Sequence, residues 1–464
     1  MMENIVVLDK AESVCPECLK RIPARKIKED DCVYLVKECL EHGTFRTLIW
    51  QGDPDYESWC HKKIPSTPVV CATNVEQGCP FDCGLCPDHR QQPCCVLLEI
   101  TERCNLSCPI CFASAQETVH SDPDISVIEG WYRMLLASGG PYNIQLSGGE
   151  PTVRDDLPDI IRLGHKLGFE FIQINTNGLR LAREPHFVDQ LKEANLNCVF
   201  LQFDGLSDEI YQTIRGAALL DVKLAAIENC ARRDIGIVLV PTLVPAVNTH
   251  HIGAILHFAI EHMPAIRGVH FQPMSYFGRY PSLPPSERLT IPRIIKEIEG
   301  QTAGKLKVEN FLPPGGENSY CSFHGNFLLM ANGDLRPWSL FQTAQCCAKP
   351  TVAAQGAKSA RAFVAKQWSA SSCCTDGQSA STSEVRREDN AQGINTDSID
   401  DFLQRVNTYT LSISGMAFQD AWNLEIDRLR DCLIHVVSPA GKLIPFCAYN
   451  LTARDGTSLY RGKS

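Results

Sequence analysis

Three cysteines that lie within eight residues of one another place the strongest constraint on how this chain folds. Cys104, Cys108 and Cys111 have C-x3-C-x2-C spacing and directly follow a strand-like run at Val96–Thr101. A loop this short can turn three sulfurs towards one centre, which suits an iron–sulfur cluster. A cube of four irons bound by three thiolates keeps one iron open for a small-molecule ligand. The alternative is a zinc site, although zinc loops favour paired C-x2–4-C spacing with a distant second pair.

The distribution of cysteines divides the chain. Of 23 cysteines in 464 residues, fourteen lie in the first 111 residues, two between 112 and 320, and seven from Cys321 onward. An odd number of cysteines in a chain of this length argues against a disulfide framework and favours metal-binding thiols in a reducing, anaerobic cytoplasm. We therefore expect cysteine-rich metal-binding extensions on both sides of a different central domain.

Residues 1–59 are expected to form a small domain like a rubredoxin or a zinc ribbon. Cys15-Pro-Glu-Cys18 is one metal-binding knuckle, and Cys39-Leu-Glu-His42 supplies a second pair of ligands. The segment between them alternates like a strand, and this order can arrange four ligands tetrahedrally. Cys32 is a competing ligand to His42. Zinc and a mononuclear iron both suit this set.

Residues 60–94 contain a second group of cysteines. Cys79, Cys83 and Cys86 repeat the x3/x2 spacing, with glycines and prolines between them. Such loops turn backbone amides towards cluster sulfides, so we expect an auxiliary iron–sulfur cluster here. The sequence does not choose its fourth ligand, and the candidates are Cys60, Cys71, Cys94 and Cys95.

From residue 95 to about 280, short β-rich runs alternate with amphipathic helical stretches. The expected strands are Val96–Thr101, Asn143–Ser147, Phe171–Thr176, Cys198–Asp204, Gly236–Val244 and Gly268–Met274. The expected helices are Ile125–Ala137, Asp156–Leu167, Pro185–Ala194, Asp221–Arg233 and Thr249–His262. Six β/α units predict an α/β fold, a partial (β/α)6 TIM-like barrel that stays open, with helices outside a parallel sheet. The site of such a fold lies at the carboxyl ends of its strands.

Polar residues follow several of these strands. Paired glycines allow close approach of the backbone to a ligand, a carboxylate can accept from an amine, and asparagines can bond ribose hydroxyls. Residues of these types are also ordinary in βα turns, which is the alternative for each of them. The candidates are Gly148, Gly149, Glu150, Asn175, Asn177 and Asp204.

The cysteine motif, the Ser147–Pro151 segment (SGGEP) and the six β/α units together resemble the radical S-adenosylmethionine (SAM) superfamily. The resemblance implies that Cys104, Cys108 and Cys111 bind a 4Fe–4S cluster whose open iron chelates SAM. It implies reductive cleavage of SAM to methionine and a 5′-deoxyadenosyl radical that abstracts hydrogen from a substrate. It also assigns SAM-binding roles to Phe112 near adenine, Asn175 and Asn177 near ribose, and Gly148, Gly149 and Glu150 at the methionine amine.

The flanking segments resemble one subgroup, which includes the archaeal tetraether-lipid synthases and the 6-hydroxymethyl-dihydropterin dimethyltransferase-like proteins. This resemblance implies one or two auxiliary 4Fe–4S clusters besides the SAM-binding one. It implies methylation or carbon–carbon coupling at an unactivated C–H bond of a small-molecule, lipid or peptide substrate. It also implies a reducing electron donor such as ferredoxin or flavodoxin.

Residues 281–464 are expected to form an auxiliary-cluster region. Cys321, Cys432 and Cys447 are its predicted ligands, and buried structural thiols are the alternative. Asn332-Gly333 predicts the turn of a hairpin within Asn326–Arg336. Residues 348–395, with Cys373-Cys374 inside and Cys346-Cys347 at the edge, lack steady periodicity and are expected to be a mobile insertion. Packing helices are expected at Ile399–Leu411 and Phe418–Arg430.

Charge and hydropathy exclude other classes. A formal net charge of −10 argues against a nucleic-acid surface. No apolar run approaches a membrane span and the first residues lack the regions of a signal peptide, so we expect a soluble cytoplasmic protein. The remaining alternatives are a peptide- or protein-modifying radical SAM enzyme and a non-catalytic electron carrier or metal-binding module. A carrier would use the same thiols without needing the Ser147–Pro151 segment.

Overall fold

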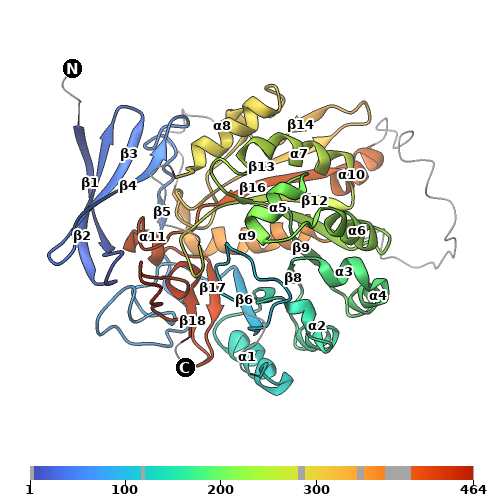
Figure 1. The fold of residues 1–464 in the computed structure, drawn as a ribbon, viewed down its shortest axis with the longest axis horizontal. Helices are drawn as coiled ribbons and strands as arrows, with labels where there is room; N and C mark the ends of the chain where they lie inside the picture. Colours follow the sequence, from blue (N-terminus) through green and yellow to red (C-terminus); the bar gives the residue numbers. More distant parts are fainter. Residues whose placement is uncertain (1–4, 116–120, 281–287, 342–349, 371–398, 463–464) are drawn as a thin grey trace.

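The computed structural model describes residues 5–115, 121–280, 288–341, 350–370 and 399–462 (Figure 1). The vicinal pairs Cys346-Cys347 and Cys373-Cys374 lie outside the described residues.

The N-terminal region is a four-stranded antiparallel sheet in the order β1-β2-β3-β4. Its strands are β1 (Ile5–Val14), β2 (Arg21–Glu29), β3 (Cys32–Cys39) and β4 (Gly43–Gln51). The β3–β4 turn needs Gly43, whose φ of +77° is costly for residues with a β-carbon. β3 therefore delivers Cys39 to one end of the sheet and Cys32 to the other, about 23 Å apart at the usual strand rise.

The central sheet contains the six predicted strands in one parallel array. They are β6 (Cys95–Thr101), β7 (Asn143–Gly148), β8 (Ile172–Thr176), β9 (Cys198–Gln202), β10 (Gly236–Val240) and β12 (Ile266–Pro273). Consecutive strands pair in parallel in the order β6-β7-β8-β9-β10-β12. The short β11 (Thr242–Leu243) continues the fifth unit and pairs with β12.

Helices cover the outer face of this sheet, as the periodicity predicts. They are α1 (Ile125–Ala137), α2 (Leu157–Lys166), α4 (Pro185–Glu193), α6 (Leu220–Ala231) and α7 (Ile252–Glu261), with the shorter α3 (Leu179–Arg183) and α5 (Asp208–Arg215) between them. On α1, for example, Ile128, Tyr132 and Leu135 are fully buried at helical spacing. The predicted TIM-like arrangement is confirmed.

Two further parallel strands extend the barrel. β16 (Thr410–Met416) pairs in parallel with β12, and β17 (Ile434–Val437) pairs in parallel with β6. The predicted helix Ile399–Leu411 is therefore wrong at its end, because α10 (Ile399–Thr408) stops before β16. Leu411 and Ile413 face the core on one side of β16 while Ser412 and Ser414 line a cavity on the other, which is a strand pattern of period two.

The outer edges of these strands are paired antiparallel. β13 (Ser322–Leu329) lies between β16 and β14 (Leu335–Pro337), so the predicted hairpin is confirmed, and β18 (Leu443–Pro445) pairs with β17 and leads into α12 (Phe446–Tyr449). The predicted helix Phe418–Arg430 is restricted to α11 (Ile426–Arg430). Asp420 prevents the longer helix, since its carboxylate accepts from the backbone of Trp422 and pairs with Arg288, Nη2 to Oδ2, at 2.8 Å.

The expectation of a mobile insertion at 348–395 is wrong for residues 353–368. They form α9 (Ala353–Trp368), preceded by β15 (Thr351–Val352), which pairs with β5 (Lys63–Ile64). This helix packs through small residues, so its sequence shows no apolar periodicity from which it could be predicted. Gly356 lies so close to Gly315 that a β-carbon on Gly356 would be 2.3 Å from the Gly315 carbonyl oxygen.

α9 closes the barrel at the amino ends of its strands. The Asn143 side chain, at the start of β7, donates to the Arg361 carbonyl at 3.0 Å. The Trp368 ring stacks on Phe200 with centroids 5.4 Å apart. α9 therefore forms a wall on the side of the barrel that lies opposite the carboxyl ends of the strands.

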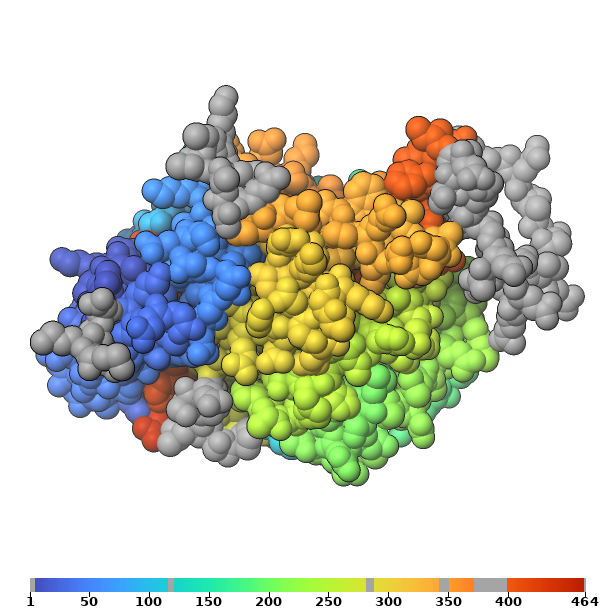
Figure 2. Space-filling model, turned by 90° about the horizontal axis from the view of Figure 1, so that it is seen from above, coloured from blue at the N-terminus to red at the C-terminus, as the bar shows by residue number. Residues whose placement is uncertain are grey.

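The N-terminal sheet is held to the rest of the molecule by a buried lysine. Lys37 on β3 is fully buried and its amine donates to the carbonyls of Val14 and Ala421, at 2.8 and 2.6 Å. The red helix α11 lies between this blue sheet and the barrel in Figure 1, in contact with β1. Figure 2 shows the blue sheet beside the yellow segment of α8 (Ile291–Gln301), which contacts β4.

No helix among the described residues is both long enough and apolar enough to cross a bilayer.

Substitution of Arg267 can test how α9 is attached to the barrel. This buried arginine of β12 donates to the carbonyls of Gln367 at 3.1 Å and Asn407 at 2.8 Å. Arg267→Met should leave these carbonyls unpaired, which costs about 1–3 kcal/mol, and should speed amide hydrogen exchange in α9 about tenfold or more. Hydrogen-exchange mass spectrometry measures this. Arg293→Met, at an exposed ion pair, is the control, and equal exchange in both variants would contradict the assignment.

Candidate active site and metal centres

A cavity of about 1450 Å³ occupies the barrel and reaches its carboxyl ends. Two separate cysteine sets line it. One is the loop after β6, with Cys104, Cys108 and Cys111, and the other comprises Cys321, Cys432 and Cys447 from the C-terminal region. Phe112, Gly148, Gly149, Glu150, Asn175 and Asn177 line the same cavity. The structure therefore brings most of the predicted SAM-binding residues into one space.

The cysteine loop after β6 is held by an arginine from beyond β12. Cys111 and Arg279 exchange two backbone hydrogen bonds of 2.9 Å, and the Arg279 side chain donates to the Cys108 carbonyl at 2.7 Å. Burial raises the pKa of the Cys104 thiol to about 12, so metal binding must supply the energy to deprotonate it. Three thiols on one fixed loop facing a cavity fit a cluster with an open iron.

The paired glycines allow the turn after β7 to lie directly on the cysteine loop. Gly149 N donates to the Thr101 carbonyl and Glu150 N to the Arg103 carbonyl, both at 2.8 Å. A β-carbon on Gly148 would lie 2.1 Å from the Thr101 oxygen, and one on Gly149 would lie 2.1 Å from the Arg103 oxygen. The close approach that the sequence suggested is therefore made to the protein's own backbone.

Glu150 is buried beneath this turn with its carboxylate largely satisfied. Oε1 accepts from the Thr152 backbone at 3.1 Å and from the hydroxyls of Thr152 and Thr176 at 2.6 Å, while Oε2 accepts from Asn177 N at 2.7 Å. Burial raises the pKa of Glu150, and these hydrogen bonds oppose the shift. A carboxylate offers about four acceptor positions, so Oε2 can take one further donor, such as an amine.

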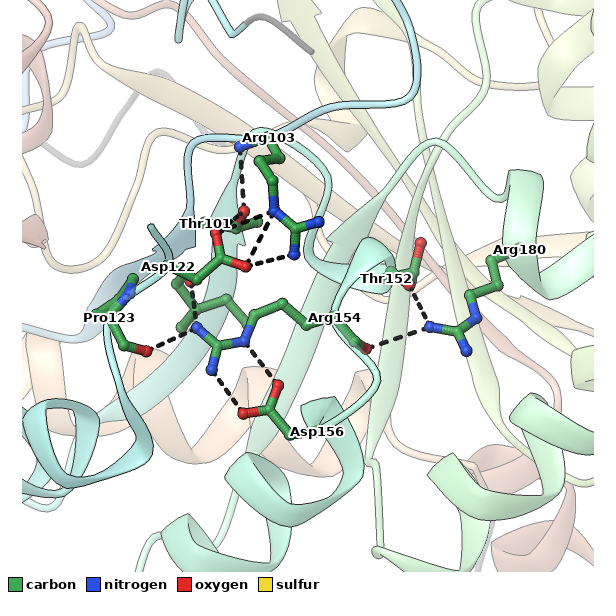
Figure 3. Close-up of polar contacts among 9 residues, drawn as sticks. Thr101, Arg103, Asp122, Pro123, Thr152, Arg154, Asp156 and Arg180 are labelled. Carbon is green, nitrogen blue, oxygen red and sulfur yellow. Dashed lines mark hydrogen bonds and ion pairs between the residues drawn. The ribbon is translucent and has the colours of Figure 1, made fainter. Parts of the chain in front are cut away.

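Arginines lock the surrounding loops in place (Figure 3). Arg103 forms an ion pair with Asp122, which also accepts from the Thr101 hydroxyl at 2.6 Å. Arg154 donates to the Ile100 carbonyl at 2.7 Å and forms a two-point ion pair with Asp156.

Arg180 extends this network to the other side of the Ser147–Pro151 turn. Its guanidinium donates to the Thr152 carbonyl at 2.8 Å (Figure 3). Because Thr152 also donates to Glu150, the arginines fix the turn that carries the buried carboxylate.

The remaining predicted SAM-binding residues differ in how they reach the cavity. Asn175 faces it directly, whereas the Asn177 amide bonds the Asn105 side chain at 2.7 Å and so supports the cysteine loop. Asp204 is fully buried behind Arg215, which forms a two-point ion pair with it at 2.7 and 2.9 Å. It is the Arg215 guanidinium that lines the cavity, and it opposes the rise that burial causes in the pKa of Cys108.

The predicted metal site of the N-terminal sheet is assembled. The ligand atoms of Cys15, Cys18, Cys39 and His42 all lie within 4.8 Å of one another, which fits one tetrahedral metal with ligand atoms about 3.8 Å apart. Hydrogen bonding with His42 lowers the pKa of Cys39 to about 6. The competing Cys32 is excluded from this group, because it lies at the opposite end of β3 with its thiol on Asp31.

Cys79, Cys83 and Cys86 lie on a tightly built loop. One Asp82 oxygen accepts from three consecutive backbone N–H groups, of Glu76, Gln77 and Gly78, at 2.6–2.8 Å. All three thiols are buried, and contacts with the thiols of Cys83 and Cys86 are the strongest influences on the pKa of Cys79. Of the four candidate fourth ligands, Cys71 is joined to this loop, since Ala72 N donates to the Leu85 carbonyl at 3.1 Å.

The other three candidates lie elsewhere. Cys60, Cys94 and Cys95 line the central cavity together with Cys321, Cys432 and Cys447. Burial raises the pKa of Cys432 well above its usual value, and the nearby Cys447 and Cys321 raise it further. Arg428 approaches the Cys321 sulfur at 3.6 Å. The C-terminal set is thus a second group of thiols, close together and facing the cavity.

Three arginines that contact or support the cysteines were not predicted from the sequence: the buried Arg215 and Arg428 and the half-buried Arg279. Each is distant in sequence from the cysteine that it contacts or supports, so no local spacing marks it. The only sequence signal for such a residue is an arginine within an otherwise apolar or helical segment, because a buried arginine needs a polar partner.

Comparisons with known proteins identify two segments of the chain. Residues 98–259 match the radical SAM superfamily, and residues 7–51 match the HMPTM N-terminal zinc ribbon domain.

Individual relatives are similar over different lengths. The 7,8-dihydro-6-hydroxymethylpterin dimethyltransferase of Methanocaldococcus jannaschii is 34% identical over 486 aligned residues, covering 96% of this chain and 94% of that protein. The Fe-coproporphyrin III synthase of Methanosarcina barkeri is 34% identical over 143 residues, which are 30% of this chain and 34% of that protein. The crystal structure of Streptococcus suis SuiB bound to precursor peptide SuiA aligns with a TM-score of 0.34 and 16% identity, over 40% of this chain and 41% of that one.

The N-terminal metal site can be tested with a matched pair of cysteines on one strand. Cys39→Ser should remove one bound metal per chain and leave the sulfide content unchanged, because the other cysteine sets are separate. Cys32→Ser should keep the full metal content. Elemental analysis with sulfide determination measures both. Retention of the metal in Cys39→Ser, or its loss in Cys32→Ser, would overturn the ligand assignment.

Proposed function

We propose that this chain, which belongs to the radical SAM superfamily and to the family of 7,8-dihydro-6-hydroxymethylpterin dimethyltransferase, transfers methyl groups to a reduced pterin. Family membership, predicted from the cysteine motif, is confirmed, and it makes the chain an enzyme rather than a non-catalytic carrier. The observation that best supports this proposal is the sequence identity with the Methanocaldococcus jannaschii enzyme, which extends over nearly the whole of both chains and includes the metal-binding extensions. The methyl group would come from a second SAM or another one-carbon donor.

The SAM site would be built by residues already in place. Cys104, Cys108 and Cys111 would hold a 4Fe–4S cluster, which supplies the electron that splits SAM into methionine and a 5′-deoxyadenosyl radical able to take hydrogen from the substrate. The remaining acceptor position on Glu150 would bind the methionine amine. Asn175, exposed to the cavity, would bond the ribose, and Phe112 would pack near the adenine.

Asp204 takes a different part in this proposal. Its carboxylate is occupied by Arg215, so it would orient that arginine towards the cavity instead of contacting SAM. Asn177 would likewise hold the cysteine loop and Glu150 in position through its side chain and backbone.

Two auxiliary clusters complete the proposal. One would be held by Cys79, Cys83 and Cys86, with Cys71 as fourth ligand because its neighbour bonds that loop. The other would be held by Cys321, Cys432 and Cys447, whose thiols face the cavity. The N-terminal site would hold zinc, which suits four close ligands and needs no redox partner. Electrons would come from a small cytoplasmic donor such as ferredoxin or flavodoxin.

Cys104 provides the direct test. Cys104→Ser, in protein reconstituted without oxygen, should form no 5′-deoxyadenosine from SAM under reducing conditions. It should keep the iron of the other cysteine sets, because these lie on different loops. Chromatography of the products and iron analysis measure the two outcomes, and Cys230→Ala, a buried thiol of α6, is the control.

The pterin assignment needs its own readout. Wild-type protein given a 7,8-dihydro-6-hydroxymethylpterin should yield products heavier by one and two methyl groups, and isotopic labelling of the SAM methyl identifies the donor. SAM cleavage without any change in mass of the pterin would reject the substrate and keep the radical SAM assignment.

A further inference from the structure

The barrel interior carries an unusual polar wall. Gln145 on β7 and Gln173 on β8 are directly opposite one another in the parallel register and both line the cavity. The Gln173 amide donates to the Gln145 carbonyl oxygen at 2.6 Å. This contact leaves the Gln173 carbonyl as an acceptor beside the N–H donors of Gln145.

Two of the amide oxygens on this side of the cavity have no hydrogen-bond donor within the part of the chain that the structure describes. Among the described residues, neither Gln173 Oε1 nor Gln202 Oε1 accepts a hydrogen bond, although both atoms are buried. The whole Gln173 side chain is nearly inaccessible, at 2% exposure of the residue. A buried acceptor without a donor is costly, and such atoms in a cavity indicate a ligand that supplies the donors.

Three aromatic rings of the same cavity lie against one another, with His270 tilted by 44° to Phe200 and by 63° to Trp368. Phe200 and Trp368 stack with an interplanar angle of 30°, and the His270 ring lies 5.5 Å from Phe200. His270 is fixed by a 2.8 Å contact of Nδ1 with the Ser414 hydroxyl. Each of these residues comes from a different element, α9 included, so this aromatic surface exists only in the folded barrel.

We propose that Gln145, Gln173 and Gln202, with the Phe200–Trp368–His270 surface, form the subsite that binds the flat heteroaromatic ring of the substrate. An acceptor beside a donor is complementary to a ring edge that carries an N–H or amino group next to a ring nitrogen or carbonyl. The aromatic rings would stack on the face of that ring. This inference rests on the proposed function and names the residues that would recognise the pterin.

The same observations disfavour a lipid chain as the occupant. A saturated chain has no donors, so it would bury the unpaired amide oxygens of Gln173 and Gln202 without compensating them. A ring with alternating donors and acceptors satisfies them.

Binding can be measured without turnover. The probe is 6-hydroxymethylpterin, a fluorescent oxidised pterin, titrated into the full-length holoenzyme in the absence of reductant. Gln173→Leu and Gln202→Leu should each raise its Kd about tenfold or more, because each removes a hydrogen bond and leaves a ring donor unpaired. Gln355→Leu, at a cavity-lining glutamine of α9 outside the proposed subsite, should bind like wild type. Iron content and the unfolding midpoint establish that each variant is folded.

The outcomes separate this inference from the proposed function. If wild type binds the probe and both β-strand variants bind it equally well, the subsite is wrong and the pterin assignment stands. If wild type does not bind the pterin, guanosine is the second probe, since it presents a similar edge. Guanosine binding weakened by Gln173→Leu would keep the subsite and reject the pterin, and no binding of either ring would overturn the subsite.

Discussion

The close approach of two backbone segments, Thr101–Arg103 and Gly148–Glu150, fixes the geometry on which the rest of the site depends. Two hydrogen bonds of 2.8 Å join them, and no residue larger than glycine fits at either contact point. Because one segment leads into the cysteine loop and the other carries Glu150, this contact sets the distance between the thiols and the buried carboxylate. A methyl group at Gly148 or Gly149 would force them apart, whatever its effect on ligands.

The cavity is also shaped by what bounds it. α9 lies across the amino ends of the strands and forms the wall of the cavity there, with the cysteine loop at the other end. A wall at this end suits chemistry in which a reactive species must be kept from water. Burial also makes polar side chains in the barrel costly. An amide such as Gln173, which is hidden from solvent, needs its hydrogen-bond partners within the cavity.

Hydrophobic periodicity predicted the six central strands and the main helices outside them, but it did not predict α9 or β16. Strands such as β8 and helices such as α1 carry strong period-two or period-3.6 patterns, because one face of each meets the core. α9 packs through glycine and alanine and so shows no apolar stripe, and the serines of β16 face the cavity where a core strand would carry apolar residues. The cysteine spacings predicted the two ligand pairs of the N-terminal site, Cys15 with Cys18 and Cys39 with His42, since each pair is local. The arginines that hold the cysteine loop were not predictable, because Arg279 and Arg215 meet it only through the fold.

The same distinction explains why spacing could not assign the fourth ligand beside Cys79, Cys83 and Cys86. Cys94 and Cys95 are near them in sequence, yet Cys95 begins β6 and Cys94 directly precedes it, and β6 pairs with β17, which follows Cys432. Strand pairing therefore carries both thiols to the central cavity and the C-terminal cysteines. Cys71 precedes Cys79 by as many residues as Cys94 follows Cys86, yet it stays beside the loop because its neighbour Ala72 bonds the Leu85 carbonyl. Because of this one parallel strand pair, cysteines that are neighbours in the sequence belong to different groups in space.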